Sequence, residues 1–246
     1  MGGGPAVLLQ LAHPLVAVGI VQHSDYRRDL WRRLVRTLRA LYLIAFGTKV
    51  EAEQAGQAVQ AVHVHVHGTT ERELGRFPAG TPYSAADPEL MLWVHATLVH
   101  SSLAVYSRFV SALTVDEEER YYQEMALVAR LFGTPDAVIP SSLSEFRDYF
   151  AEQLASGTLT VTPPARDVAD VIVEAALPAP MRALVPAHRL ATAGLLPPRL
   201  RAEYGLRWTA LHELALPVAA RSVRLATGPV LFAASRIAPP VEKLAA

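Results

Sequence analysis

Apolar side chains recur every three or four residues along most of the chain, which is the spacing of one face of an α-helix. The segment from Arg27 to Phe46 follows this pattern and is closed by Gly47, a common residue at helix C-termini. Its regularly spaced leucines are Leu30, Leu34, Leu38 and Leu41. The pattern predicts a long amphipathic helix here.

Three further helices are predicted from start and stop signals. The first begins at the N-cap candidate Asp87, has Pro88 in its first turn and runs to about Val110. The other two begin with capping boxes, in which a Ser or Thr and a Glu three residues later satisfy free N–H groups. They run from Thr114-Val115-Asp116-Glu117 to Gly133 and from Ser142-Leu143-Ser144-Glu145 to Gly157.

The first 24 residues contain no Asp, Glu, Lys or Arg. A secretory signal would begin with basic residues, whereas this chain begins with Met-Gly-Gly-Gly-Pro. A transmembrane helix from Pro5 to Val21 would carry Gln10, His13 and Pro14 through the hydrocarbon layer. We therefore predict a buried helix here, after a Gly-rich start that is compatible with a short leader upstream.

Prolines divide the chain after Thr160 into shorter helical segments. They are Pro163, Pro164, Pro178, Pro180, Pro186, Pro197, Pro198 and Pro217. Only Thr158 to Thr162 has the composition of a strand, and one short strand makes no sheet. The sequence therefore predicts an all-α fold, a single compact domain over residues 1–246 with about nine or ten helices, in which the helices of residues 160–246 complete the core.

Composition narrows the functional classes. The chain has 246 residues, of which 51% are hydrophobic, and its 23 basic side chains balance 23 acidic ones. Because nucleic-acid binding relies on an excess of positive charge, we expect no nucleic-acid partner. The absence of cysteine excludes disulfides, thiolate metal sites and cysteine nucleophiles.

Common catalytic motifs are missing from the sequence. There is no Gly-x-Ser-x-Gly, no P-loop, and no dinucleotide-binding glycine motif after a predicted strand. No pair of carboxylates lies in an apolar context, as glycoside hydrolysis would require. The run Asp116-Glu117-Glu118-Glu119 is expected to be a solvated first helical turn, stabilised by the helix dipole.

Histidines are concentrated between positions 61 and 100, and three of them alternate with valine in Val62-His63-Val64-His65-Val66-His67. On a strand all three imidazoles would share one face, whereas on a helix only His63 and His67 would. The residues before this run favour a helix from about Val50 to His67, with Gly68 as its stop. Two histidines at this spacing can bind zinc, but the general base of the zinc-peptidase motif is absent. Ordinary core or surface roles are expected for His65, His100, His188 and His212.

Arg33, Arg36 and Thr37 are three and four residues apart, so they share one face of the helix predicted over residues 27–46. Inward-facing guanidinium groups would need an anionic partner. Haem offers its propionates as that partner, and it also requires an apolar slot and one neutral imidazole. The alternative, which spacing alone favours, is that Arg32, Arg33, Arg36 and Arg39 form a solvated basic stripe.

A series of short motifs lies in order along the first 150 residues. They are Gly4-Pro5-Ala6, Leu11-Ala12-His13-Pro14, His23-Ser24, Arg36-Thr37-Leu38, Phe46-Gly47-Thr48, His63, Pro82-Tyr83-Ser84, Asp87-Pro88-Glu89-Leu90 and Trp93-Val94-His95-Ala96-Thr97. Two later ones are Leu196-Pro197-Pro198-Arg199 and Tyr204-Gly205-Leu206-Arg207-Trp208. The set resembles the MpaB and rubber-oxygenase (latex-clearing protein) catalytic-domain family, over about residues 3–150, and the later motifs resemble its small bacterial members.

The resemblance implies an all-helical protein that binds haem b and uses dioxygen to cleave isoprenoid carbon–carbon double bonds. It implies that His63 is the proximal iron ligand and that Arg33 and Thr37 lie beside the haem. Arg36 stands where the latex-clearing enzymes have a lysine that approaches the iron. Because arginine stays protonated, it cannot serve as that ligand, so the sixth position would be open or filled by water or another histidine.

The sequence therefore predicts a haem-b oxygenase that acts with dioxygen on an apolar small molecule of isoprenoid type. The expected metal ligand is His63, the expected catalytic residues are Arg33, Arg36 and Thr37, and the expected cofactor-binding residues are His63, Arg33, Thr37, His13, His23 and His95. Two alternatives stay open: a non-catalytic helical module that binds haem or lipid, and a metal hydrolase using His63 and His67. We expect a cytoplasmic location without a firm membrane span, and the mean hydropathy of +0.22 leaves peripheral membrane association open.

Overall fold

The computed structural model of the chain describes residues 3–24, 26–173 and 179–237, with side chains except those of residues 26–34, 179–181 and 227–237. The described residues form eleven α-helices, two short 3₁₀ helices and one two-stranded sheet, which confirms the all-α fold with more helices than expected. The elements are α1 (Gly3–Leu11), α2 (Pro14–His23), α3 (Tyr26–Phe46), α4 (Lys49–His63), β1 (His67–Thr69), β2 (Pro82–Ser84), α5 (Pro88–Phe109), α6 (Val115–Leu131), η1 (Asp136–Val138), α7 (Leu143–Ala155), α8 (Pro163–Val173), η2 (Ala179–Leu184), α9 (Val185–Gly194), α10 (Pro198–Glu203) and α11 (Ala210–Ile237).

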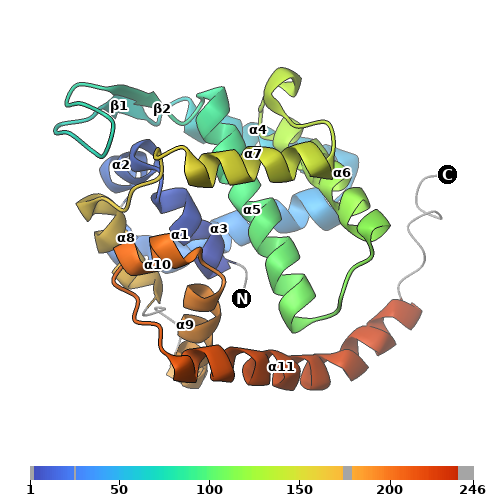
Figure 1. Cartoon of the computed structure of the whole chain (residues 1–246). Helices are drawn as coiled ribbons and strands as arrows, with labels where there is room; N and C mark the ends of the chain where they lie inside the picture. The colour runs from blue at the N-terminus through green and yellow to red at the C-terminus, as the bar shows by residue number, and fades with distance from the viewer. Residues whose placement is uncertain (1–2, 25, 174–178, 238–246) are drawn as a thin grey trace.

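The central helix is α5, with α1 and α2 to one side of it, α6 to the other and α7 across its front (Figure 1). Its predicted start is confirmed, since the Asp87 side chain accepts hydrogen bonds from the N–H groups of Glu89 and Leu90. Trp93 of α5 stacks on Phe150 of α7 with ring centroids 5.6 Å apart, and both rings belong to the largest hydrophobic cluster. The core of the protein is thus built around this helix.

The predicted N-terminal helix is two helices. α1 and α2 meet at 104° because His13 adopts an extended conformation directly before Pro14. Proline has no N–H group and disfavours a helical conformation in the residue before it, so it ends one helix and begins the next. The predicted burial is confirmed, since Leu8, Leu9 and Leu11 lie wholly inside the core.

Within the described chain, α5 is long and apolar enough to cross a membrane by length and composition, and so are α1 and α2 if the bent pair is counted as one span. The central helix of a protein core has the same length and composition. α5 buries Trp93 and Val99 in the largest hydrophobic cluster, together with residues of other helices. The described residues therefore contain no firm membrane span.

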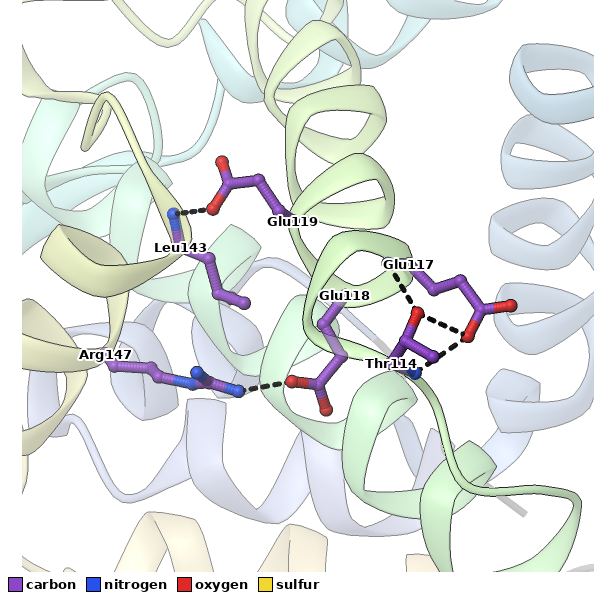
Figure 2. A network of polar contacts seen from close by, with 6 residues as sticks. All are labelled: Thr114, Glu117, Glu118, Glu119, Leu143 and Arg147. Carbon is purple, nitrogen blue, oxygen red and sulfur yellow. Dashed lines mark hydrogen bonds and ion pairs between the residues drawn. The ribbon is translucent and has the colours of Figure 1, made fainter.

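The predicted helix starts and stops of α6 and α7 are confirmed. Thr114 Oγ1 accepts the N–H of Glu117, and the Glu117 carboxylate accepts the N–H of Thr114 at 2.7 Å (Figure 2). Gly133 and Gly157 follow the two helices with φ of 92° and 72°, a left-handed conformation that glycine adopts without a steric penalty. The capping box at Ser142 is incomplete. The Ser142 side chain accepts the N–H of Glu145, but the Glu145 carboxylate accepts the N–H of Ser141 and not that of Ser142.

The expectation of a solvated acidic turn is wrong for two residues of α6. Glu118 forms an ion pair with Arg147 of α7 at 2.6 Å, and Glu119 accepts the backbone N–H of Leu143 at 3.1 Å (Figure 2). Both partners lie on the next helix, more than twenty residues along the chain, so local pattern alone could not reveal them. The acidic turn therefore holds α7 in place as well as beginning α6.

The predicted helix from Val50 to His67 is α4, and it ends at His63. The chain then enters β1, where Gly68 pairs with Tyr83 of β2 and is not a helix stop. Of the alternating valines and histidines only His67 lies in the strand, and β2, the antiparallel partner after a long loop, supplies the hydrogen bonds that a longer helix would otherwise make. The prediction was wrong here because the partner strand lies outside the local window.

Thr158–Thr162 is not a strand. Two of its N–H groups instead donate hydrogen bonds to other parts of the chain. Thr160 donates to the carbonyl of Ala12 at 2.8 Å, and Val161 donates to the Glu203 carboxylate at 2.9 Å. These contacts satisfy the buried backbone without a sheet.

Prolines begin several C-terminal helices, as predicted. Pro163, Pro186 and Pro198 lie in the first turns of α8, α9 and α10, where no intrahelical N–H donor is lost. Pro217 does not divide the chain, because α11 is continuous from Ala210 to Ile237. This helix lies along the lower edge of the molecule in Figure 1, packed on α9 and on one end of α5.

Candidate functional site

His63 is the last residue of α4 and is half-buried. Its Nδ1 atom is buried and has no hydrogen-bond partner among the described residues. Burial lowers the pKa of this imidazole below its usual value, so the ring is neutral at pH 7. A neutral imidazole with an unpartnered nitrogen has the electronic state that a metal ligand requires.

α3 and α4 form a helical hairpin, joined at Gly47 and Thr48. The Thr48 side chain accepts the N–H of Glu51 in a capping box, which begins α4 directly after the turn. Arg33 and His63 each lie fifteen positions from Thr48, about 22 Å along their helices. The hairpin therefore brings the backbone of Arg33 to the level of His63, while the Arg33 side chain lies outside the described residues.

Arg36 and Thr37 are exposed, so the expected inward-facing arrangement of these two side chains is not found. Arg36 and Arg39 are both exposed, which agrees better with the alternative of a solvated basic stripe. The side chains of Arg32 and Arg33, its other two members, lie outside the described residues. No described side chain of α3, from residue 35 to residue 46, is buried. The C-terminal half of this helix therefore has side chains that are exposed or only partly buried.

One face of α3 carries apolar side chains that the described residues leave exposed. They are Val35, Leu38, Tyr42 and Phe46, exposed to between 45% and 77%. At about 100° per residue, Thr37 lies roughly 200° from Val35, on the opposite side of the helix. Thr37 thus faces away from the apolar row, on the side of α3 where position 33 also lies.

His13 and His95 are the two deeply buried histidines. Burial lowers the pKa of each to about 4, and the charge of Asp87 only partly opposes this for His13. Both nitrogens of His95, and Nδ1 of His13, are buried without a partner among the described residues. Because a neutral imidazole has one N–H and one lone pair, His95 has an unused donor and an unused acceptor inside the core.

His23 is exposed and belongs to a separate polar cluster. Its Nε2 lies 3.1 Å from the Tyr83 hydroxyl, which in turn donates to the Gln22 side chain. A Cβ on Gly68 would lie 2.8 Å from the same hydroxyl, so the glycine allows β1 to approach the tyrosine. Tyr83 was not among the predicted site residues, although it stands in the Pro82-Tyr83-Ser84 motif, and this motif was the available signal.

The structure does not bring all the predicted site residues together in one site. No hydrogen bond among the described residues links His63 with His13, His23 or His95. The described chain also contains no group of three or more His, Asp or Glu side chains that could hold a metal ion. The helical pair His63 and His67 does not exist, since His67 lies on β1, and this removes the geometric basis of the metal-hydrolase alternative.

A cavity of about 330 Å³ lies between α4 and α6, near the start of α4 and far along the helix from His63. Its walls are Lys49, Ala52, Glu53, Leu127, Arg130 and Leu131. Lys49 and Glu53 face each other at 4.0 Å on its rim. The cavity contains none of the predicted site residues and is not the site described above.

Comparison with known proteins identifies the family. The family described as "ER-bound oxygenase mpaB/B'/Rubber oxygenase, catalytic domain" matches residues 1–225. Two mycobacterial relatives, the uncharacterized protein Mb2261 of Mycobacterium bovis and the uncharacterized protein Rv2237 of Mycobacterium tuberculosis, are each 26% identical over 213 residues, covering 84% of this chain and 80% of the relative. No solved structure matches the chain. Since the match spans nearly the whole helical fold, the chain belongs to the family of MpaB and rubber-oxygenase catalytic domains, a family of oxygenases.

Proposed function

We propose that this protein is a haem-b-dependent oxygenase that acts with dioxygen on a hydrophobic small molecule of isoprenoid type. The observation that carries the proposal is the neutral, half-buried imidazole of His63 with its unpartnered Nδ1 atom. Membership of an oxygenase family supports the reaction class, and the resemblance of the motifs supports the cofactor.

The donor set fits haem better than a metal ion held by the protein alone. A porphyrin supplies four ligands to its iron, so a single axial imidazole is sufficient. The described residues offer single histidines but no cluster of three ligating side chains. When bound, haem iron would supply the activation of dioxygen, and His63 would hold the metal.

The basic residues of α3 would bind the acidic edge of the cofactor. Arg36 is exposed, and Arg33 lies at the level of His63 along the hairpin. A guanidinium matches a carboxylate in shape and charge, so either residue can pair with a propionate. Thr37, on the Arg33 side of α3, would lie beside the cofactor, as the resemblance implies.

His13 and His95 would act as neutral groups. Because burial keeps their pKa near 4, neither carries a charge at pH 7, and each can donate or accept a hydrogen bond without placing a cation in an apolar interior. His23 is exposed and hydrogen-bonded to Tyr83, which favours a role at the rim. A cytoplasmic location remains a prediction.

The absorption spectrum of purified protein saturated with haem tests the proposal. We expect a Soret band with a stoichiometric haem, and we expect His63→Ala to lose or shift that band and to recover it when free imidazole is added. His65→Ala is the matched control, since His65 is an exposed histidine two residues further along. An unchanged Soret band in His63→Ala would refute the ligand assignment, and a colourless protein after haem loading would favour the non-catalytic lipid-binding module.

A further inference from the structure

α11 is held firmly on the body of the protein by its inner face. Leu216 and Ala220 are buried in a cluster with Phe109 of α5 and Ala191 of α9. Arg224 also donates from Nε to the carbonyl of Arg108 at 3.0 Å, at the end of α5 where helical carbonyls lack partners. The orientation of α11 is therefore fixed, and its opposite face points away from the protein.

That outer face carries a row of large apolar side chains. Leu211, Leu214, Val218 and Leu225 are 78%, 69%, 66% and 70% exposed. Their spacings of three, four and seven residues are those of the a and d positions of a heptad repeat, and Arg221 occupies the one missing position. A helix that is apolar on its inner and outer sides is expected to be covered on both.

The width of the row indicates the kind of partner. An a/d row is the narrow seam that one helix presents to another, whereas a membrane-surface helix needs a broader apolar face with a strongly basic polar side. The exposed neighbours Ala215 and Ser222 are small, and the Ser222 hydroxyl already donates to the Val218 carbonyl at 3.0 Å. Another helix could therefore approach the seam closely, provided that the long Arg221 side chain extends its guanidinium to solvent at the edge.

We propose that α11 pairs with α11 of a second copy of this chain, in an antiparallel arrangement about a two-fold axis. In a parallel pair the two Arg221 side chains would occupy the same layer and repel each other, whereas an antiparallel pair separates them. Covering the four exposed side chains on both copies buries on the order of 1,000 Å², about the minimum for a specific interface. The pairing does not depend on haem.

Sedimentation velocity of the full chain, as isolated and over a range of micromolar concentrations, tests this proposal. We expect a reversible dimer for the unmodified protein and a monomer for the double variant Leu214→Glu, Val218→Glu, with the dissociation constant raised at least a hundredfold. The control is Val115→Glu, which places one added carboxylate at a 73% exposed apolar residue of α6 and should leave the dimer intact. Unchanged circular dichroism in all variants shows that they fold.

Because the chain has no cysteine, single-cysteine variants test the orientation. We expect Val218→Cys, near the middle of the row, to form a disulfide-linked dimer on oxidation, and Leu211→Cys, at its end, to stay monomeric under denaturing conditions. Cross-linking through Leu211→Cys would overturn the antiparallel arrangement. A monomer at all concentrations would overturn the proposal. So would a monomer that binds anionic phospholipid vesicles in a flotation assay and loses that binding in Leu214→Glu, Val218→Glu, because a membrane would then cover the row.

Discussion

Burial at single residues sets the protonation state of the candidate site. His13 and His95 lie in apolar surroundings, where the charged form of an imidazole loses its hydration, and their pKa falls to about 4. The pKa values of His63, His100 and His188 shift in the same direction for the same reason. The interior thus keeps these histidines uncharged, which is the form that can ligate a metal.

Stability should therefore fall in mild acid. Between pH 6.5 and 4 the unfolded chain binds protons at His13 and His95 while the folded chain does not, so the free energy of unfolding decreases as the pH falls through this window. We expect a loss of roughly 2 kcal/mol per histidine between pH 7.5 and 5, by the linkage of proton binding to folding. Urea unfolding at the two pH values measures it.

The variant His95→Gln, which cannot titrate, should show a smaller pH dependence than the unmodified protein. His65→Gln is the control, because an exposed histidine leaves the dependence unchanged. Equal slopes in all three proteins would show that burial of His95 does not govern the acid response.

At the scale of elements, helix ends combine local and tertiary contacts. The capping box of α6 is local, whereas the carboxylates of Glu118 and Glu119 reach α7 (Figure 2). We expect Thr114→Ala to lower the free energy of unfolding by about 1 kcal/mol, because it removes the acceptor for the Glu117 N–H.

Thr114→Ser keeps the hydroxyl acceptor, so we expect it to lower the free energy of unfolding by less than half as much as Thr114→Ala. Both variants can be compared by urea unfolding at one pH. A Thr114→Ala protein as stable as the unmodified one would mean that the docking of α7, and not the cap, determines where α6 begins.

At the scale of the whole molecule, two helices of the described chain carry rows of exposed apolar side chains. α11 carries one, and α3 carries the other next to the candidate site. If α11 forms the proposed dimer, pairing stabilises the folded chain by mass action, and stability depends on concentration. We expect the melting temperature to rise by about 3–5 °C for a hundredfold increase in concentration. The double variant Leu214→Glu, Val218→Glu should melt at a constant temperature over the same range.

Sequence reasoning was most successful where the signal lies within a few residues. The starts of α5 and α6 and the glycine stops at Gly133 and Gly157 are confirmed, because caps and left-handed turns depend on adjacent side chains. It failed where a distant segment competes with the local preference. α4 gives way to β1 because β2 offers backbone partners.

The sequence by itself determined the fold class, the family and the short list of imidazoles and guanidiniums from which a site could be built. These follow from periodicity, capping residues and ordered motifs, all of which are properties of the chain in one dimension. Only the tertiary structure decided that His63 is half-buried and neutral, that His67 lies on a strand and that Arg36 is exposed. Burial, and the pKa shifts that follow from it, depend on which segments pack together. A local sequence pattern does not reveal which distant segment will pack against it.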